Sequence, residues 1–565
     1  MTDPLVVGLV GLLVIAGAAL VGPKIGVAAP LVLVAAGIVA SLVPWIPDAE
    51  IDPEWILAGV LPPLLYASAV SMPTMNFRRE FGAISGLSVA LVVGSSLVLG
   101  LFFAWVVPGL GLAWGIALGA IVSPTDAVAT SIVKQTSVSR RVIAILDGES
   151  LLNDATALVL LRTAIAAGAA SFSFWGAVGD FAYAVAVAVA IGLVVGWLNL
   201  RVRARVTNAT VNTALSFAVP FAASIPAEGL HASGLVAAVV AGLVTGIRAP
   251  RVLPPTHRLS DAQNWGTVSF VLEGAVFLVM GLELASIVAD VQRDHAGIVP
   301  ALLIALGALV LTVLVRAAYV VPLLWGLSRS ADRQARLQGR LEEYRSADRA
   351  ATSAALQEHR FGNRQPSERD LERFGARIRR VLADIRYFSA APLGWREGTA
   401  VVWSGMRGAV TVAAAQTLPD GTPQKSLLVF VAFAVAVLSL LLQGGTIGPL
   451  LRRISPPRSD DTAKDREERR RLMEVMRSAA EQVTAASAEP TAPRTREELE
   501  ATDPAELRAW FGREKTRRLQ VLDAQRSALL DARDDGVFDA DVLESVLGNL
   551  DAEQIALELR GGPAG

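Results

Sequence analysis

The chain has 565 residues, of which 53 % are hydrophobic, and its net charge is -1. It contains no cysteine, which excludes a disulfide framework, a thiolate metal site and a cysteine nucleophile. Apolar blocks of about 20 residues recur over the first 326 residues, each long enough to span a hydrocarbon core of about 30 Å. These blocks are rich in Ala, Val, Leu and Gly and lack the alternation of an outer-membrane barrel, so they predict an all-α membrane protein.

The apolar blocks predict about thirteen transmembrane helices. The first block lacks a basic n-region and a convincing cleavage site, which favours a retained span over a signal peptide. The predicted spans cover residues 4–22, 26–44, 54–72, 84–108, 112–134, 141–168, 175–199, 208–226, 232–248, 264–290, 296–326, 398–418 and 425–451.

Basic residues in the connections predict the orientation of the spans, because cytoplasmic loops are enriched in Lys and Arg. The connections after even-numbered spans hold only Arg293 and Lys425. This alternation predicts an N-terminus outside, a C-terminus in the cytoplasm and an odd number of spans. The connections after spans one, three, five, seven and nine carry Lys24, Arg78, Arg79, Lys134, Arg140, Arg141, Arg201, Arg203, Arg205, Arg248, Arg251 and Arg258.

The distribution of apolar and charged segments predicts four domains along the chain. Residues 1–327 hold the first part of the transmembrane region, and residues 398–452 hold its last two helices. Residues 328–397 form a charged insertion, expected to be a cytoplasmic helical hairpin, and residues 453–565 form a charged cytoplasmic helical tail with a Pro- and Thr-rich linker at 489–495. The basic run Arg466–Arg471 most simply makes a solvated helix, with anionic lipid headgroups as the alternative; no nucleic-acid partner is expected.

Two of the predicted spans are interrupted. The fifth is broken at Ser123–Asp126, because Pro124 removes a backbone donor and clashes with the preceding turn. The twelfth contains the irregular stretch Ser404–Gly408. The two breaks are seven spans apart, so helices one to six and eight to thirteen are expected to be inverted repeats whose broken helices cross at the membrane midplane, as in secondary transporters.

The sixth span carries the residues with the most telling chemistry. Ser150 and Asp154 are four apart and share one helix face, while Glu149 and Asn153 share the neighbouring face. A carboxylate at membrane depth costs about 3 kcal/mol or more and is read by default as an ion or proton site. A hydroxyl one turn from a carboxylate offers two hard oxygen ligands to a small monovalent cation, and a proton competes for the same carboxylate.

The remaining intramembrane charges are expected to serve as partners. The burial of Glu149 requires a cation, which Arg316 in the eleventh span can supply in a purely structural ion pair. Asp126 beside a half-helix N-terminus, and Arg407 near a half-helix C-terminus, have the signs needed to compensate the helix ends. A simple helix cap is the alternative for Asp126 and is compatible with that role. Glu273 in the tenth span has either an accessory role in transport or a structural pairing.

These residues resemble the sodium/proton exchangers of the monovalent cation:proton antiporter superfamily, in particular their bacterial form. The two core motifs of that family are similar to Ser123–Ala129 (SPTDAVA) and Gly148–Ala155 (GESLLNDA), the second being the more specific. The resemblance covers about residues 1–452 and a tail stretch at 532–559. Weaker matches are Leu61–Tyr66, His231–Gly234, Val271–Phe277, Val315–Tyr319 and Gly405–Ala409.

The resemblance implies a role for each residue of the sixth span. Asp154 would alternate between cation and proton, and Ser150 with the backbone and side chain of Thr125 would complete the ion shell. Asn153 stands where the electrogenic branch of the family has a second aspartate, which implies electroneutral exchange of one cation for one proton. Glu149 would form the family's buried ion pair.

One departure from the family pattern concerns the third span. Many relatives place an acidic residue after the motif that ends at Tyr66, where this chain has Ala67 and Ser68. A contribution from that acid to the cation shell is therefore absent, and cation preference is expected to be affected. The family also implies a homodimer and no cofactor.

The sequence thus predicts an inner-membrane secondary antiporter that exchanges a monovalent cation, Na⁺ before K⁺ or Li⁺, for H⁺. A K⁺/H⁺ antiporter of the same fold is the closest alternative. A cation channel, or a transporter core converted into a sensor, is the remote one. Gly148–Ser150 lacks the Gly-x-Ser-x-Gly frame of a hydrolase, so an enzyme is not expected.

Overall fold

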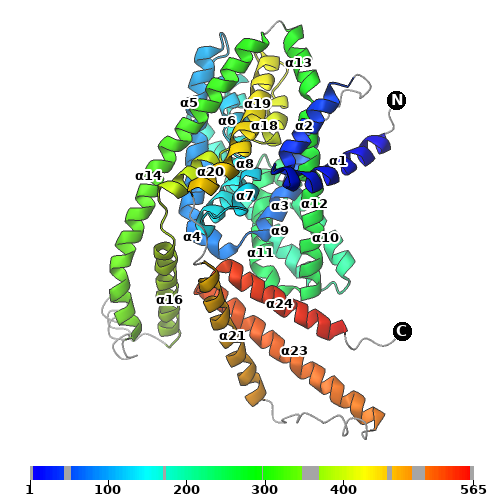
Figure 1. Cartoon of the computed structure of the whole chain (residues 1–565), viewed down its shortest axis with the longest axis vertical. Helices are drawn as coiled ribbons and strands as arrows, with labels where there is room; N and C mark the ends of the chain where they lie inside the picture. The colour runs from blue at the N-terminus through cyan, green and yellow to red at the C-terminus, as the bar shows by residue number, and fades with distance from the viewer. Residues whose placement is uncertain are drawn as a thin grey trace. The chain divides into compact units, whose positions relative to one another are not determined.

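The computed structural model describes residues 4–43, 52–169, 174–294, 297–346, 368–454, 461–486 and 503–559 (Figure 1). The chain divides into two compact units. The first, here called the membrane unit, comprises Met1–Ala249, Ser260–Leu327 and Leu393–Pro457. The second, the tail unit, comprises Pro250–Leu259, Ser328–Pro392 and Arg458–Gly565.

Helices make up the membrane unit, as predicted. Among the described residues, nine helices are long and apolar enough to cross a membrane, and shorter apolar helices accompany them; the count of thirteen spans stays a prediction. The helices are α1 (Pro4–Ile25), α2 (Ala29–Ser41), α3 (Leu61–Ser71), α4 (Thr74–Ser85), α5 (Val92–Val106), α6 (Leu112–Val122), α7 (Val128–Lys134), α8 (Arg140–Ala169), α9 (Phe174–Arg203), α10 (Ala209–Gly229), α11 (Gly234–Val252), α12 (Pro255–Leu282), α13 (Leu284–Arg293), α14 (Ile298–Ser346), α17 (Trp395–Trp403), α18 (Ala409–Gln416), α19 (Lys425–Ser439) and α20 (Gly445–Ile454).

Small residues and π-helical turns shape the packing of these helices. A π-helical turn at Gly86–Leu91 joins α4 to α5, so one apolar stretch runs from Thr74 to Val106. Helices α5 and α6 pack so closely that a Cβ atom on Gly119 would collide with the backbone of Ser96. Close approach through small residues is the usual way in which membrane helices associate. This close packing lies just before the first break, which follows the end of α6 at Val122.

Helix α19 forms the centre of the largest apolar cluster. It contributes the buried side chains of Phe430 and Phe433. In the most apolar part of the stretch Lys425–Ile454, 78 % of the residues are buried. A helix that is apolar all round is expected to be buried by other helices. The adjoining helices α6, α13 and α18 pack against it.

The two predicted breaks are present and lie against each other. Extended backbone separates α6 from α7, and a second extended segment separates α17 from α18. A backbone hydrogen bond from Asp126 N to Met406 O, at 2.8 Å, joins the two segments. The crossing of two broken helices is therefore confirmed, while the inverted repeat that motivated it stays a prediction.

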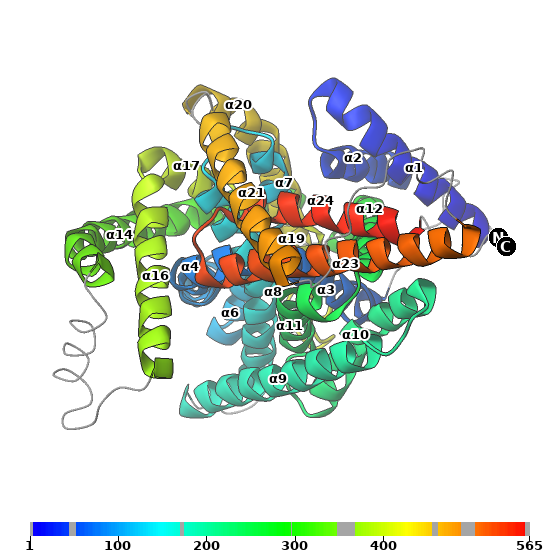
Figure 2. The same ribbon diagram turned by 90° about the horizontal axis from the view of Figure 1, so that it is seen from below.

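The tail unit has its own apolar core. Helices α21 (Asp461–Ala486), α23 (Pro504–Asp535) and α24 (Ala540–Leu559) pack together through Leu472, Leu529 and Leu543 (Figure 2). The carboxylate of Asp539 caps the N-terminus of α24 by accepting hydrogen bonds from the backbone N–H groups of Asp541 and Val542. These contacts make the three helices a small bundle.

The charged insertion also belongs to the tail unit in part. Helix α14 continues without interruption to Ser346, and α16 covers Glu368–Ala390. Residues 347–367, at the centre of the predicted hairpin, and residues 489–495, the predicted linker, lie outside the described residues.

Candidate functional site

The carboxylate of Asp126 lies at the start of half-helix α18. Its Oδ1 accepts a hydrogen bond from Val128 N at 2.9 Å, and a Cβ atom on Gly408 would overlap Oδ2. The first N–H groups of a helix lack intrahelical partners and carry partial positive charge, which stabilises an adjacent anion. Asp126 therefore caps the first turn of α7 and also compensates the N-terminus of α18.

Arg407 provides the opposite charge at the end of α6. Its side chain is 1 % exposed, and its Nε donates to Val122 O at 2.8 Å. Its two terminal nitrogens donate to the carbonyls of Ser123 and Gly405. The last carbonyls of a helix carry partial negative charge and attract a cation. The two breaks thus carry complementary charges of the predicted sign.

Glu149 and Arg316 form a buried ion pair beside the crossing. The Nη1–Oε1 distance is 2.5 Å and the Nη2–Oε2 distance is 2.8 Å, with side chains 3 % and 2 % exposed. Arg316 Nε donates to Val401 O in α17 at 2.8 Å. This two-point geometry fixes a planar guanidinium on a carboxylate. The pairing expected from the burial of Glu149 is present.

Asn153 and Thr125 connect this ion pair to the first break. Asn153 Nδ2 donates to both Thr125 O and Thr125 Oγ1 at 2.9 Å, and Thr125 Oγ1 donates to Glu149 Oε1 at 3.0 Å. Asn153 is fully buried, and its Oδ1 has no hydrogen-bond partner among the described residues. The family resemblance implies a place for Thr125 beside Ser150 and Asp154, whereas its hydroxyl bonds to Glu149 and Asn153 on the neighbouring face of α8.

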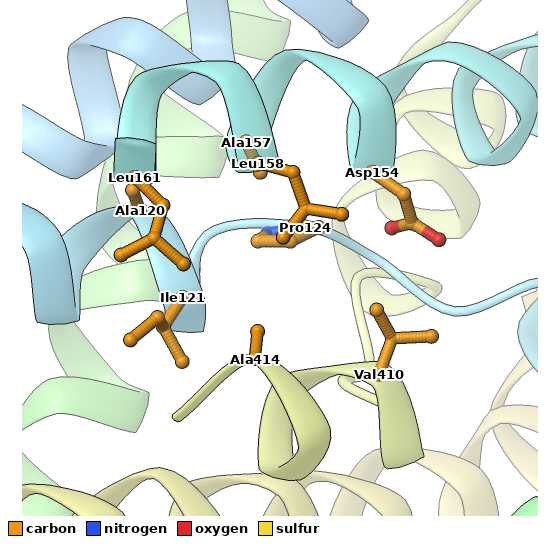
Figure 3. A pocket seen from close by; sticks show the side chains of 9 residues that line it. All are labelled: Ala120, Ile121, Pro124, Asp154, Ala157, Leu158, Leu161, Val410 and Ala414. Atoms are coloured by element: carbon orange, nitrogen blue, oxygen red, sulfur yellow. The ribbon is translucent and has the colours of Figure 1, made fainter. Parts of the chain in front are cut away.

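Asp154 lies on the other face of α8 and points toward α18. Figure 3 shows its carboxylate beside the extended segment at Pro124 and across from Val410. Ser150, one turn away, donates to Asp147 O at 3.1 Å. Asp154 is the charged member of a pocket whose lining is otherwise apolar: Ala120, Ile121, Pro124, Ala157, Leu158, Leu161, Val410 and Ala414.

When they are ionised, three carboxylates create a negative potential at this crossing. Asp126 interacts electrostatically with Asp154 and also with Glu273, which is exposed on α12. The two buried guanidinium groups nearby are engaged elsewhere, Arg316 by Glu149 and Arg407 by backbone carbonyls. A cluster of like charges with low-dielectric walls raises the local concentration of counter-ions. The arrangement can therefore attract and bind a cation.

Two further buried ion pairs are not predicted by the sequence. Arg141 Nε contacts Glu80 Oε1 at 2.6 Å and ties α8 to α4. Arg203 pairs with Asp261 and donates to Asn212 Oδ1 at 2.7 Å, which ties α9 to α10 and α12. The sequence predicts both arginines only as charges of cytoplasmic connections. The sequence feature that could have predicted these pairs is an acidic residue at a similar depth in another helix, Glu80 for Arg141 and Asp261 for Arg203.

Comparison with known proteins places the chain in a family. The model of the family described as "Sodium/hydrogen exchanger, transmembrane" matches residues 10–365 and 371–453. The uncharacterized Na⁺/H⁺ exchanger Rv2287 of Mycobacterium tuberculosis is 27 % identical over 464 residues, which are 80 % of this chain and 75 % of that protein. A "sodium, potassium, lithium and rubidium/H⁺ antiporter" of Bacillus subtilis is 26 % identical over 276 residues, which are 47 % of this chain and 41 % of that protein.

A solved structure shares the fold. The sodium proton antiporter MjNhaP1 from Methanocaldococcus jannaschii, at pH 8, aligns with a TM-score of 0.56 and 14 % identity, covering 79 % of this chain and 97 % of that chain. The family match extends over both broken helices and the span that carries Asp154. The chain belongs to the sodium/hydrogen exchanger family, a family of membrane transporters.

Proposed function

We propose that the chain exchanges a monovalent cation, Na⁺ in the first place, for H⁺ across the inner membrane, with Asp154 as the shared site. One observation carries this proposal: Asp154 is the charged residue in the pocket between the first break and α18. Its charged neighbour is a second carboxylate, that of Asp126. A carboxylate in such a place is neutralised by whichever cation reaches it.

Ser150 and Thr125 are proposed to supply further oxygen atoms for the cation. Ser150 uses its proton in the bond to Asp147 O, which leaves its oxygen lone pairs free to bind a cation. The carbonyl of Thr125 accepts one bond from Asn153 and has a second lone pair. Hard oxygen ligands of this kind suit small alkali-metal ions.

The exchange is proposed to be electroneutral. Asn153 presents an amide where a second carboxylate would add a further titratable charge, and its Nδ2 is committed to Thr125. One carboxylate that alternates between one cation and one proton returns to the same net charge in both loaded states. No charge then crosses the membrane in a complete cycle.

Orientation and assembly belong to the same proposal. The alternation of basic connections supports an N-terminus outside and a C-terminus in the cytoplasm. The resemblance to the family supports a homodimer with lipid around it. Alternating access is proposed to expose Asp154 to one side of the membrane at a time.

Asp154→Asn tests the central claim in proteoliposomes that contain a trapped pH dye. A Na⁺ jump is expected to drive proton efflux from wild-type vesicles and none from the variant, because an amide neither ionises nor binds a proton at neutral pH. Asp147→Asn is the matched control on the same helix, since Asp147 pairs with Lys134 at 3.0 Å and is 28 % exposed. Full exchange by Asp154→Asn would refute the proposal.

K⁺ is the second candidate for the transported cation. The printed name of the Bacillus subtilis relative includes potassium, lithium and rubidium as well as sodium. Adding Na⁺, K⁺ or Li⁺ separately to everted vesicles and comparing the proton fluxes separates these cases. A flux that does not saturate and needs no counter-gradient would instead indicate a channel.

A further inference from the structure

Within the tail unit, the connection between α11 and α12 is bound by the C-terminal helices. This segment, Pro250–Leu259, is here called the connector. Arg258 Nη2 contacts Asp551 Oδ1 of α24 at 2.6 Å, with side chains 15 % and 17 % exposed. The neighbouring Leu253 and His257 are also buried, at 4 % and 3 % exposure. An ion pair that is mostly shielded from water is weakly screened by salt, and apolar burial adds to it.

A second contact joins the connector to the end of α23. Arg251 Nη2 lies 3.0 Å from Asp531 Oδ1 and 2.7 Å from Asp534 Oδ2. Both acids are close to the C-terminus of the helix, where the partial negative charge of the backbone opposes an anion. Their position destabilises an isolated α23, and a bound arginine offsets that effect.

The same helix end binds α16 through the adjacent acid. Arg379 Nε and Arg380 Nε lie 3.3 Å and 3.9 Å from the carboxylate oxygens of Asp535. Helix α16 ends at Ala390, and α17 begins at Trp395. The end of α23 thus binds two segments that are far apart in the sequence, the connector and the helix that leads into the second broken span.

We propose that the carboxylates of Asp531, Asp534 and Asp535 form an acidic clasp that holds the connector and α16 together and slows the transport cycle. This inference rests on the proposed function, since α18 carries part of the ion pocket whereas α11 and α12 contribute no residue to its lining. Alternating access requires movement of the pocket helices against the rest of the bundle. Fastening both segments to one helix end opposes that movement.

The clasp is tested in the full-length protein with Asp531→Asn, Asp534→Asn and Asp535→Asn combined. Asparagine keeps the shape of each side chain, and exposures of 71 %, 48 % and 27 % allow the substitution without disturbing the bundle core. Amide hydrogen exchange in peptides that cover the connector is expected to quicken by about two- to fivefold, as for the loss of exposed ion pairs. Na⁺-driven proton flux at saturating Na⁺ is expected to rise by about twofold or more.

Two further variants identify the cause. Arg251→Glu combined with Asp531→Arg and Asp534→Arg exchanges the charges at both contacts of Arg251. Compared with Arg251→Glu alone, this variant is expected to return connector protection toward the wild-type value. Glu506→Gln removes an acid from the other end of α23, where it is exposed, and is expected to change neither measurement.

Each outcome decides one claim. Unchanged hydrogen exchange in the triple variant would show that the clasp does not hold the connector. A released connector with an unchanged flux would show that the clasp does not restrain transport. Absence of flux in the wild-type protein would overturn the proposed function instead, and hydrogen exchange would still report on the clasp.

Discussion

The carboxylate of Asp126 occupies the space in which a Cβ atom on Gly408 would stand. These residues belong to different broken helices, and the backbone bond from Asp126 N to Met406 O lies beside them. The two breaks therefore contact each other closely, through the Asp126 carboxylate at Gly408 and through the backbone hydrogen bond to Met406. A side chain at residue 408 cannot be accommodated without moving the acid.

Gly408→Ala is expected to displace Asp126 and to lower the rate of exchange by about tenfold, since forcing an atom into a packed site costs about 1–3 kcal/mol. Na⁺-driven proton flux in proteoliposomes measures the effect. Gly445→Ala is the control, because a Cβ atom at that position meets nothing within 4 Å. Equal flux in the two variants would contradict the tight packing of the crossing.

Arg316→Ala is expected to lower the free energy of unfolding by about 3–5 kcal/mol, because it leaves Glu149 buried without a counter-charge. Thermal unfolding in detergent, followed by tryptophan fluorescence, measures the loss. Combining Arg316→Met with Glu149→Leu removes both charges and is expected to recover most of the stability. If the double variant is no more stable than Arg316→Ala, the pair does not account for the loss.

Asn153→Asp tests whether the hydrogen bonds that the Asn153 amide donates to Thr125 stabilise the protein. An aspartate cannot donate the two hydrogen bonds to Thr125, and it brings a carboxylate close to Glu149. Each lost bond in a buried site costs about 1–3 kcal/mol, so the variant is expected to unfold at a lower temperature. Solid-supported-membrane electrophysiology with Na⁺ jumps is expected to record no net charge transfer during exchange by the wild-type protein. A transient transport current from the wild-type protein would contradict 1:1 exchange.

Competition for one carboxylate predicts a specific pH dependence. Lowering the pH on the cation side alone is expected to raise the apparent KM for Na⁺, by up to about tenfold per pH unit once the proton occupies the site, with an unchanged maximal rate. Initial rates over a matrix of Na⁺ and H⁺ concentrations measure this effect. A fall in maximal rate at constant KM would indicate separate sites for the two ions.

The sequence was sufficient to predict the ion pair of Glu149 with Arg316. Both charges lie inside apolar spans, where an uncompensated charge is costly, so few partners were available. It was also sufficient for the signs of Asp126 and Arg407, because Pro124 and the glycines at 405 and 408 mark the helix ends. Local chemistry and depth in the membrane determine these contacts in each case.

The partners of Thr125 could not be predicted in the same way. Helical periodicity assigns Ser150 and Asp154 to one face of α8, but Thr125 lies in extended backbone, where no periodic rule fixes the direction of a side chain. The pairs of Glu80 with Arg141 and of Arg203 with Asp261 depend on which helices are neighbours. That information comes only from tertiary packing.

The separation of these partners along the chain has a consequence for biosynthesis. Glu149 meets Arg316 across 167 positions, and the end of α6 meets Arg407 across 285 positions. A nascent chain therefore inserts its first broken helix and the acids of α8 well before the arginines that stabilise them are synthesised. We expect chains truncated before residue 316 to be degraded rapidly by membrane quality control, and the ion site to be among the last parts of the protein to mature.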